Sequence, residues 1–389
     1  MRTFQYHLYF HYFCDCFTRS IFMRRYFPNL NSLRFIAASL VIIHHIESHK
    51  AFFKLNNLYQ INFFEIVGKL GVVLFFVLSG FLITSLLLQE YQENNSISFK
   101  KFYMRRILRI WPLYYLIVLM GFYVYPYLPF FRDPYQDIYI NAVESRSSNI
   151  YYYLSIFANL GVAKHGLVAY TSHVWSIATE EQFYLIWPLL FSVFHKRLFQ
   201  MMVAVIFFYW SVQYISYKPY LINRFLQKEF AENLRDFWYF FNINCMAIGG
   251  IFAYIIHKNY SVVKFLLNPY TFYIATLTTV LFLSFGIHFG FFHYEVYSVL
   301  FGIIISNLAF NPKLKKTLEF RITNYLGTIS YGLYMLHLPV LLIAIKIGQY
   351  FNSYYLLPYT ITFGGSILIS HLSYKYFETP FLKLKSKFL

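Results

Sequence analysis

Charged residues are scarce in this 389-residue sequence, and acidic residues are the scarcest. Asp, Glu, Lys and Arg together make up 13% of it, where a soluble domain has roughly 25%, and 58% of the residues are hydrophobic. The mean hydropathy is +0.47. A chain with so little charge cannot cover a soluble globular surface. We therefore predict an all-α integral membrane protein, a polytopic bundle of transmembrane helices.

Cysteine is almost absent as well. The sequence has three, Cys14, Cys16 and Cys245, which are too few and too scattered for a disulfide framework. It has no Cys-x-x-Cys pair and no His/Cys spacing typical of a metal site. We predict neither a disulfide nor a bound metal.

The shortage of acids leaves a formal net charge of +17. The basic residues form short clusters between apolar stretches rather than one soluble face, which argues against nucleic acid as a partner. The positive-inside rule accounts for them better, because more Lys and Arg fall inside when the N-terminus is cytoplasmic. An even number of spans then places both termini in the cytoplasm.

Hydropathy predicts about ten spans. They lie near residues 32–49, 70–89, 110–130, 181–195, 199–217, 238–256, 268–288, 291–310, 327–348 and 354–375. We assign residues 28–380 to one membrane domain and residues 381–389 to a basic cytoplasmic tail. Residues 1–27 are predicted to be an N-terminal extension, because Met23-Arg24-Arg25 looks like a natural start immediately ahead of the first span.

Residues 33–46 form an apolar run that begins with Leu33-Arg34 and ends near His44 and His45. On a helix, the 11 steps from Arg34 to His45 make about 1,100°, so the two side chains share one face with a rise of about 16 Å. His44 points about 80° away from Arg34. An imidazole this deep in a membrane marks either a functional site or a polar contact between helices.

Two further stretches carry small or basic residues at helical spacing. In residues 71–84, small side chains allow close helix packing; they are Gly71, Ser79, Gly80 and Thr84. In residues 100–112, Arg105, Arg106 and Arg109 stand three and four positions apart and converge at one membrane surface. Guanidinium groups suit phosphate oxygens, although the same cluster also serves as a topology signal or contacts anionic lipid.

Residues 173–184 combine polar and aromatic side chains immediately before a span. Candidate residues are His173, Trp175, Ser176, Glu180 and Glu181, of which Ser176 and Glu180 share a helix face. They suit binding of a hydroxyl-bearing acceptor or the orientation of an imidazole; the alternative is an interfacial aromatic belt with a capping acid. Later polar residues are predicted to be contacts between helices, and the stretch that contains His337 is the most suggestive of them.

Taken together, these stretches resemble the acyltransferase 3 family of bacterial membrane acyltransferases, which includes O-antigen and other cell-envelope O-acetyltransferases. The resemblance covers residues 28–380 and is carried in order by residues 33–45, 74–83, 105–112, 175–184 and 330–337. One departure is the pair Val72 and Val73, where family members often carry an acid. We find no carboxy-terminal esterase domain of the kind that some relatives have.

The resemblance implies an enzyme of the bacterial cytoplasmic membrane that uses acetyl-CoA as a co-substrate and has no bound cofactor. Arg105, Arg106 and Arg109 would hold the phosphates of acetyl-CoA, with Arg34 at the mouth of the site. His45 would act as general base or transient acyl carrier, and Glu180 would orient the site.

The acceptor implied by the resemblance is a hydroxyl of a saccharide or a lipid-linked glycan, bound by His173, Trp175, Ser176 and Glu181. The predicted topology places residues 173–184 near the outer face, so Glu180 meets His45 only if the loop at 131–180 folds back into the bundle. The alternative function is a membrane transporter or acyl-carrier channel, in which the buried Arg and His relay protons without bond chemistry.

Overall fold

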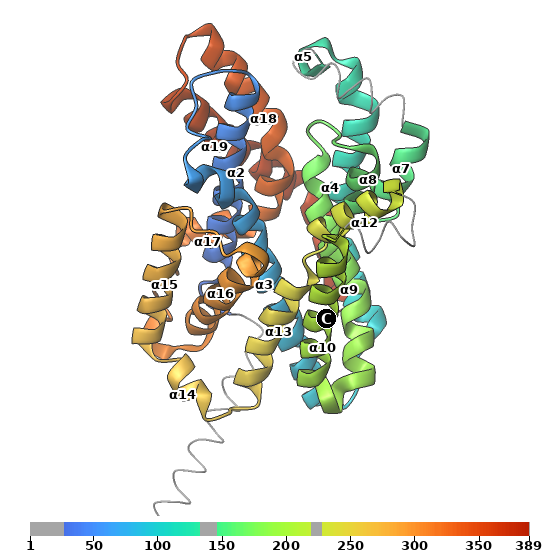
Figure 1. Ribbon diagram of the computed structural model, residues 1–389, viewed down its shortest axis with the longest axis vertical. Coiled ribbons are helices and arrows are strands. Elements are labelled where there is room, and N and C mark those ends of the chain that lie inside the picture. Colours follow the sequence, from blue (N-terminus) through green and yellow to red (C-terminus); the bar gives the residue numbers. More distant parts are fainter. Residues whose placement is uncertain (1–26, 133–145, 219–227, 389) are drawn as a thin grey trace, which may run out of the picture.

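The computed structural model describes residues 27–132, 146–218 and 228–388. The predicted N-terminal extension therefore lies outside the described residues up to position 26. Throughout the described ranges the chain is helical and contains no strand (Figure 1). The long helices are α2 (Leu30–Phe52), α3 (Asn62–Asn94), α4 (Phe99–Leu119), α9 (Trp175–Phe194), α10 (Leu198–Ser216), α12 (Lys228–Phe240), α13 (Ile243–His257), α15 (Pro269–Ser284), α16 (His293–Phe310), α18 (Ser330–Tyr350) and α19 (Leu356–Leu372).

Six stretches of the described chain are long and apolar enough to cross a membrane. They are Asn62–Asn94, Phe99–Tyr127, Ser172–Ser216, Lys228–His257, Gly290–Phe310 and Ser330–Tyr350. The prediction of a multi-pass helical membrane protein is confirmed to this extent. The number of about ten spans and the cytoplasmic position of the termini stay predictions.

Helix α3 lies between α2 and α13, and its glycines explain how closely it packs. A Cβ atom on Gly71 would lie 2.8 Å from the Ala37 carbonyl oxygen of α2. A Cβ atom on Gly80 would overlap the backbone of Met246 in α13. The close approach predicted from these small residues is present, and it presses α3 against the helix that carries Arg34 and His45.

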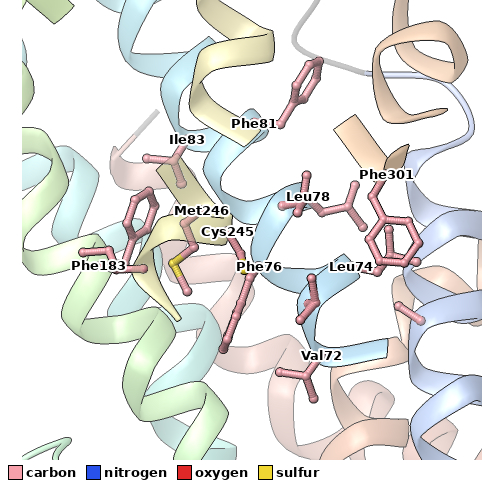
Figure 2. Close-up of a cluster of buried hydrophobic side chains, with 14 of the residues drawn as sticks. Val72, Leu74, Phe76, Leu78, Phe81, Ile83, Phe183, Cys245, Met246 and Phe301 are labelled. Atoms are coloured by element: carbon pink, nitrogen blue, oxygen red, sulfur yellow. The ribbon is translucent and has the colours of Figure 1, made fainter. Parts of the chain in front are cut away.

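The centre of the bundle is apolar on both sides of α3. Figure 2 shows Phe76 and Ile83 beside Met246 and Cys245 of α13, with Phe183 of α9 nearby, whereas Leu74 and Leu78 point towards Phe301 of α16. All of these side chains are buried in one cluster. The packing fixes the helices that frame the site described below.

Two segments outside the long helices reach the bundle. After residue 145, α7 (Arg146–Leu154) and α8 (Ala158–His165) contact α4 and α9, and the chain then enters α9 through a short turn at Ser172–Val174. Near the other end, α20 (Thr379–Leu384) and the turn Lys385–Phe388 pack along α4. The described part of the 131–180 loop thus folds against the bundle, and so does the basic tail.

Candidate active site

A cavity of about 300 Å³ lies among α2, α3, α4, α9 and α18. Its lining contains both apolar and polar side chains. The polar lining residues are Asn31, Arg34, Ser79, Arg106, Arg109, Ser176, Glu180, Tyr184, Ser330, Tyr331, Tyr334 and Lys385. The cavity therefore joins all five stretches that the sequence singled out separately. They contribute Arg34, Ser79, the pair Arg106 and Arg109, the pair Ser176 and Glu180, and Tyr334.

Positive charge dominates the cavity. Arg34, Arg106, Arg109 and Lys385 are its lining cations and Glu180 is its one lining carboxylate, so four positive charges face one negative charge. The Arg34 guanidinium donates to Asn31 Oδ1 at 2.8 Å. Arg106 Nε is buried and has no hydrogen-bond partner among the described residues, while its guanidinium lies over the Tyr184 ring at 5.3 Å. Such a set of cations suits a multiply charged anion.

The carboxylate of Glu180 is held by two hydroxyl groups. Ser79 Oγ of α3 and Tyr184 OH, one turn further along α9, both donate to Glu180 Oε1. The two hydroxyl oxygens lie 3.2 Å apart. These two hydrogen bonds hold the Glu180 side chain in one rotamer. Its carboxylate lines the same cavity as the four cations.

A group of histidines lies next to the cavity, on the far side of Tyr334. His45 Nδ1 lies 2.7 Å from His337 Nε2, and His337 Nδ1 lies 2.8 Å from the Tyr334 carbonyl oxygen. The His173 ring centroid is 5.5 Å from that of His337, and the Tyr334 hydroxyl donates to the His173 carbonyl at 3.0 Å. Tyr334 lines the cavity and also holds the histidines, so it connects the two.

These contacts fix the tautomers of neutral imidazoles. A carbonyl oxygen only accepts, so His337 Nδ1 carries the proton and His337 Nε2 holds a lone pair. His45 Nδ1 then donates to His337 Nε2, which leaves the lone pair of His45 on Nε2. That nitrogen has no hydrogen-bond partner in the described part of the chain. The arrangement leaves His45 Nε2 ready to accept a proton.

The structure separates residues that the sequence grouped together. His45 does not line this cavity, although Arg34 does, and it reaches the cavity wall only through His337 and Tyr334. Glu180 is bonded to Ser79 and Tyr184 and has no hydrogen bond to His45. The two candidate catalytic residues therefore occupy adjoining sites, and their roles stay predictions.

Within each predicted cluster, one neighbour turns away from the cavity. Arg105 donates to the Phe388 carbonyl at 3.0 Å and lies 3.7 Å from Glu90. Glu181 accepts from Trp111 Nε1 at 2.9 Å, and its other carboxylate oxygen is buried without a partner among the described residues.

The remaining predicted residues lie around the cavity at different depths. Ser176 lines it. His173 is buried against Met335 of α18, with Nε2 3.2 Å from the Met335 carbonyl oxygen. Trp175 lies outside the cavity lining, with Lys69 Nζ 4.1 Å from its ring centroid. His44, the poorer candidate, lies 2.7 Å from the Phe64 carbonyl oxygen through Nδ1.

No catalytic or binding role was assigned from the sequence to His337, Tyr334 or Lys385. The spacing of Tyr334 and His337, three positions apart beside an apolar run, was a usable signal. The sequence gives no comparable signal for Lys385, because nothing in a short basic segment indicates that the segment folds back against a helical bundle.

Comparison with known proteins gives one family and several distant relatives. The family model described as an acyltransferase domain matches residues 27–375. Peptidoglycan O-acetyltransferase OatA of Listeria monocytogenes is 28% identical in an alignment of 382 residues that covers 93% of this chain and 57% of that protein. O-acetyltransferase OatA of Staphylococcus aureus is 27% identical in an alignment of 387 residues that covers 92% of this chain and 58% of that protein.

A putative peptidoglycan O-acetyltransferase of Bacillus subtilis, YrhL, is 28% identical over 375 residues, with 92% of this chain and 55% of that protein covered. The chain thus spans a little over half the length of the curated relatives it matches. No solved structure matches it.

Proposed function

Because the chain belongs to the acyltransferase domain family, we propose that it is a membrane O-acyltransferase that moves an acetyl group from acetyl-CoA to a hydroxyl of a cell-envelope saccharide or lipid-linked glycan. The family match confirms the resemblance noted in the sequence. The names of the relatives place peptidoglycan first among the acceptors to test. The observation that carries the proposal is a cavity lined by four cations that adjoins a histidine with a free Nε2.

In this proposal the cations bind the donor. Coenzyme A carries phosphates, and Arg34, Arg106 and Arg109 present guanidinium groups that bind phosphate oxygens through charged hydrogen bonds. The thioester end of the donor then extends along α2 past Tyr334. The rise from Arg34 to His45 is about 16 Å, a distance suited to a long flexible arm rather than to a compact acyl donor.

His45 is the proposed general base. Its Nε2 takes the proton of the acceptor hydroxyl while the hydroxyl oxygen bonds to the thioester carbonyl carbon. The bond between that carbon and sulfur then breaks, coenzyme A leaves as a thiolate, and the proton on Nε2 passes to the sulfur. His337 keeps His45 in the tautomer that this step needs, and Glu180 holds Ser79 and Tyr184 against the cations.

The test uses the full chain in nanodiscs with radiolabelled acetyl-CoA and isolated glycan fragments. We expect ester-linked label in the glycan and free thiol released in step with it. His45→Ala should abolish both, whereas His44→Ala, on the adjacent residue, should retain them if the variant folds. Acetyl transfer that persists in His45→Ala would rule out His45 as the general base. In a parallel measurement on proteoliposomes that contain the chain, label that accumulates in the lumen without any ester formed would favour the transporter instead.

A further inference from the structure

We propose that the C-terminal segment (residues 379–388) is part of the donor site, and that Lys385 binds a phosphate of the acyl donor. This inference rests on the proposed function and deepens it. The segment lies beyond residue 375, where the match to the family model ends. Lys385 nevertheless lines the same cavity as Arg34, Arg106 and Arg109.

The C-terminal segment contains three lysines, and only one of them faces the cavity. Lys383, Lys385 and Lys387 follow one another at every second position. Lys383 and Lys387 are exposed, whereas Lys385 is half-buried and faces the cavity. A general attraction of a basic tail to the membrane would use all three alike. Of the three lysines, Lys385 alone is placed to contact a ligand inside the cavity.

Arg105 holds the segment in place. Its guanidinium donates to the Phe388 carbonyl oxygen at 3.0 Å and lies 3.7 Å from the Glu90 carboxylate. Arg105 does not line the cavity. It is therefore a positioning residue, whose effect on donor binding runs through the segment that it anchors.

The charge balance of the cavity indicates the class of ligand. Lys385 has no ion pair or hydrogen bond among the described residues, and the guanidinium groups next to it repel its ammonium. Burial and these arginines lower the pKa of Lys385 to about 8. A phosphate or diphosphate group would offset the repulsion, because it brings at least two negative charges.

The experiment measures binding of coenzyme A to the purified full chain in phosphatidylcholine nanodiscs by titration calorimetry. Lys385→Met should weaken binding about tenfold, the loss of one charged hydrogen bond. Lys385→Arg should retain it. The matched controls Lys383→Met and Lys387→Met remove the same charge from the same segment and should bind as the wild type does.

The outcomes separate this inference from the proposed function. If the wild type binds no coenzyme A, the donor assigned under the proposed function is wrong. If the wild type binds and Lys385→Met binds equally well, the assignment of Lys385 is wrong while the donor stands. Nanodiscs that contain phosphatidylglycerol test the other source of phosphate: a Lys385→Met effect that disappears there would identify the ligand as a lipid headgroup.

A double-mutant cycle tests the role of Arg105. Arg105→Ala should weaken coenzyme A binding in the wild type but add little in the Lys385→Met background, because both changes remove the same contact. Full additivity would mean that Arg105 acts on the donor independently of the segment, and would overturn the positioning role.

Discussion

The His45 and His337 rings lie nearly parallel, at an interplanar angle of 17°, with His45 Nδ1 2.7 Å from His337 Nε2. The two residues are 292 positions apart in the sequence. The order of donors runs in one direction, from His45 to His337 to the Tyr334 carbonyl oxygen. It leaves one basic nitrogen, His45 Nε2, and under the proposed function His337 would hold His45 in this tautomer.

Replacement of His337 tests that direction. Gln offers an amide oxygen near the position of Nε2, so His337→Gln should keep part of the rate. Met fills a similar volume without an acceptor, so His337→Met should lower kcat about 10²-fold to 10³-fold with little change in the KM for acetyl-CoA. Steady-state kinetics on protein of unchanged thermal stability checks this. Equal rates for the Gln and Met variants would reduce His337 to a packing role.

The second prediction concerns the thermal stability of variants at glycines where helices pack closely. A Cβ atom on Gly80 would overlap the Met246 backbone, whereas one on Gly364 of α19 meets nothing within 4 Å. We expect Gly80→Ala to cost about 1–3 kcal/mol or more and to lower the Tm. Gly364→Ala should leave the Tm unchanged or raise it slightly, because Ala is the better helix former. Differential scanning fluorimetry in detergent makes the comparison, and similar Tm values for both variants would contradict the α3–α13 packing described above.

Helical geometry made part of the site predictable. The positions of Ser176 and Glu180, four residues apart, predicted one shared face, and both line the cavity. The same holds for Arg106 and Arg109, three residues apart. In these two pairs the side chains converge, whereas Arg105, which was expected to converge with Arg106 and Arg109, turns to the Phe388 carbonyl oxygen instead.

Other features of the site could not be predicted from the sequence, for physical reasons. Consecutive residues on a helix point about 100° apart, so Glu181 cannot share the direction of Glu180, and it turns to Trp111 instead. Composition alone could not show which of two adjacent acids faces inward. The partners from remote helices, His337 and Lys385, depend on how the bundle assembles, and no local pattern contains that information.

The adjacent acids therefore give a third prediction. Glu180→Gln removes the one carboxylate that lines the cavity and turns one acceptor into a donor facing Ser79 and Tyr184, so kcat should fall about 10²-fold. Glu181→Gln keeps an acceptor for Trp111 and relieves a buried, half-satisfied charge, so its effect should fall on stability more than on rate. Equal losses of kcat in the two variants would restore the joint role that the sequence suggested for both acids.

Lys385 gives a prediction about pH. Burial, followed by repulsion from the guanidinium groups of Arg109, Arg106, Arg105 and Arg34, lowers its pKa from 10.5 to about 8. The cationic form is the one that binds phosphate. Lys385 of the free enzyme is therefore ready to make this contact below pH 8 and loses that charge as the pH rises through 8. The apparent KM for acetyl-CoA should therefore rise by up to about tenfold between pH 7 and pH 9.5.

Other groups near Lys385 do not produce the same profile. Burial raises the pKa of Glu378, an acid whose ordinary pKa lies far below that of a lysine. The last ionisation of a phosphate monoester lies near pH 6. Lys385→Arg keeps the charge at every pH in this range and should flatten the KM profile, whereas Lys387→Arg, at an exposed position, should leave it as in the wild type. A rise in KM that survives Lys385→Arg would assign the titration to a different group and remove Lys385 from the donor site.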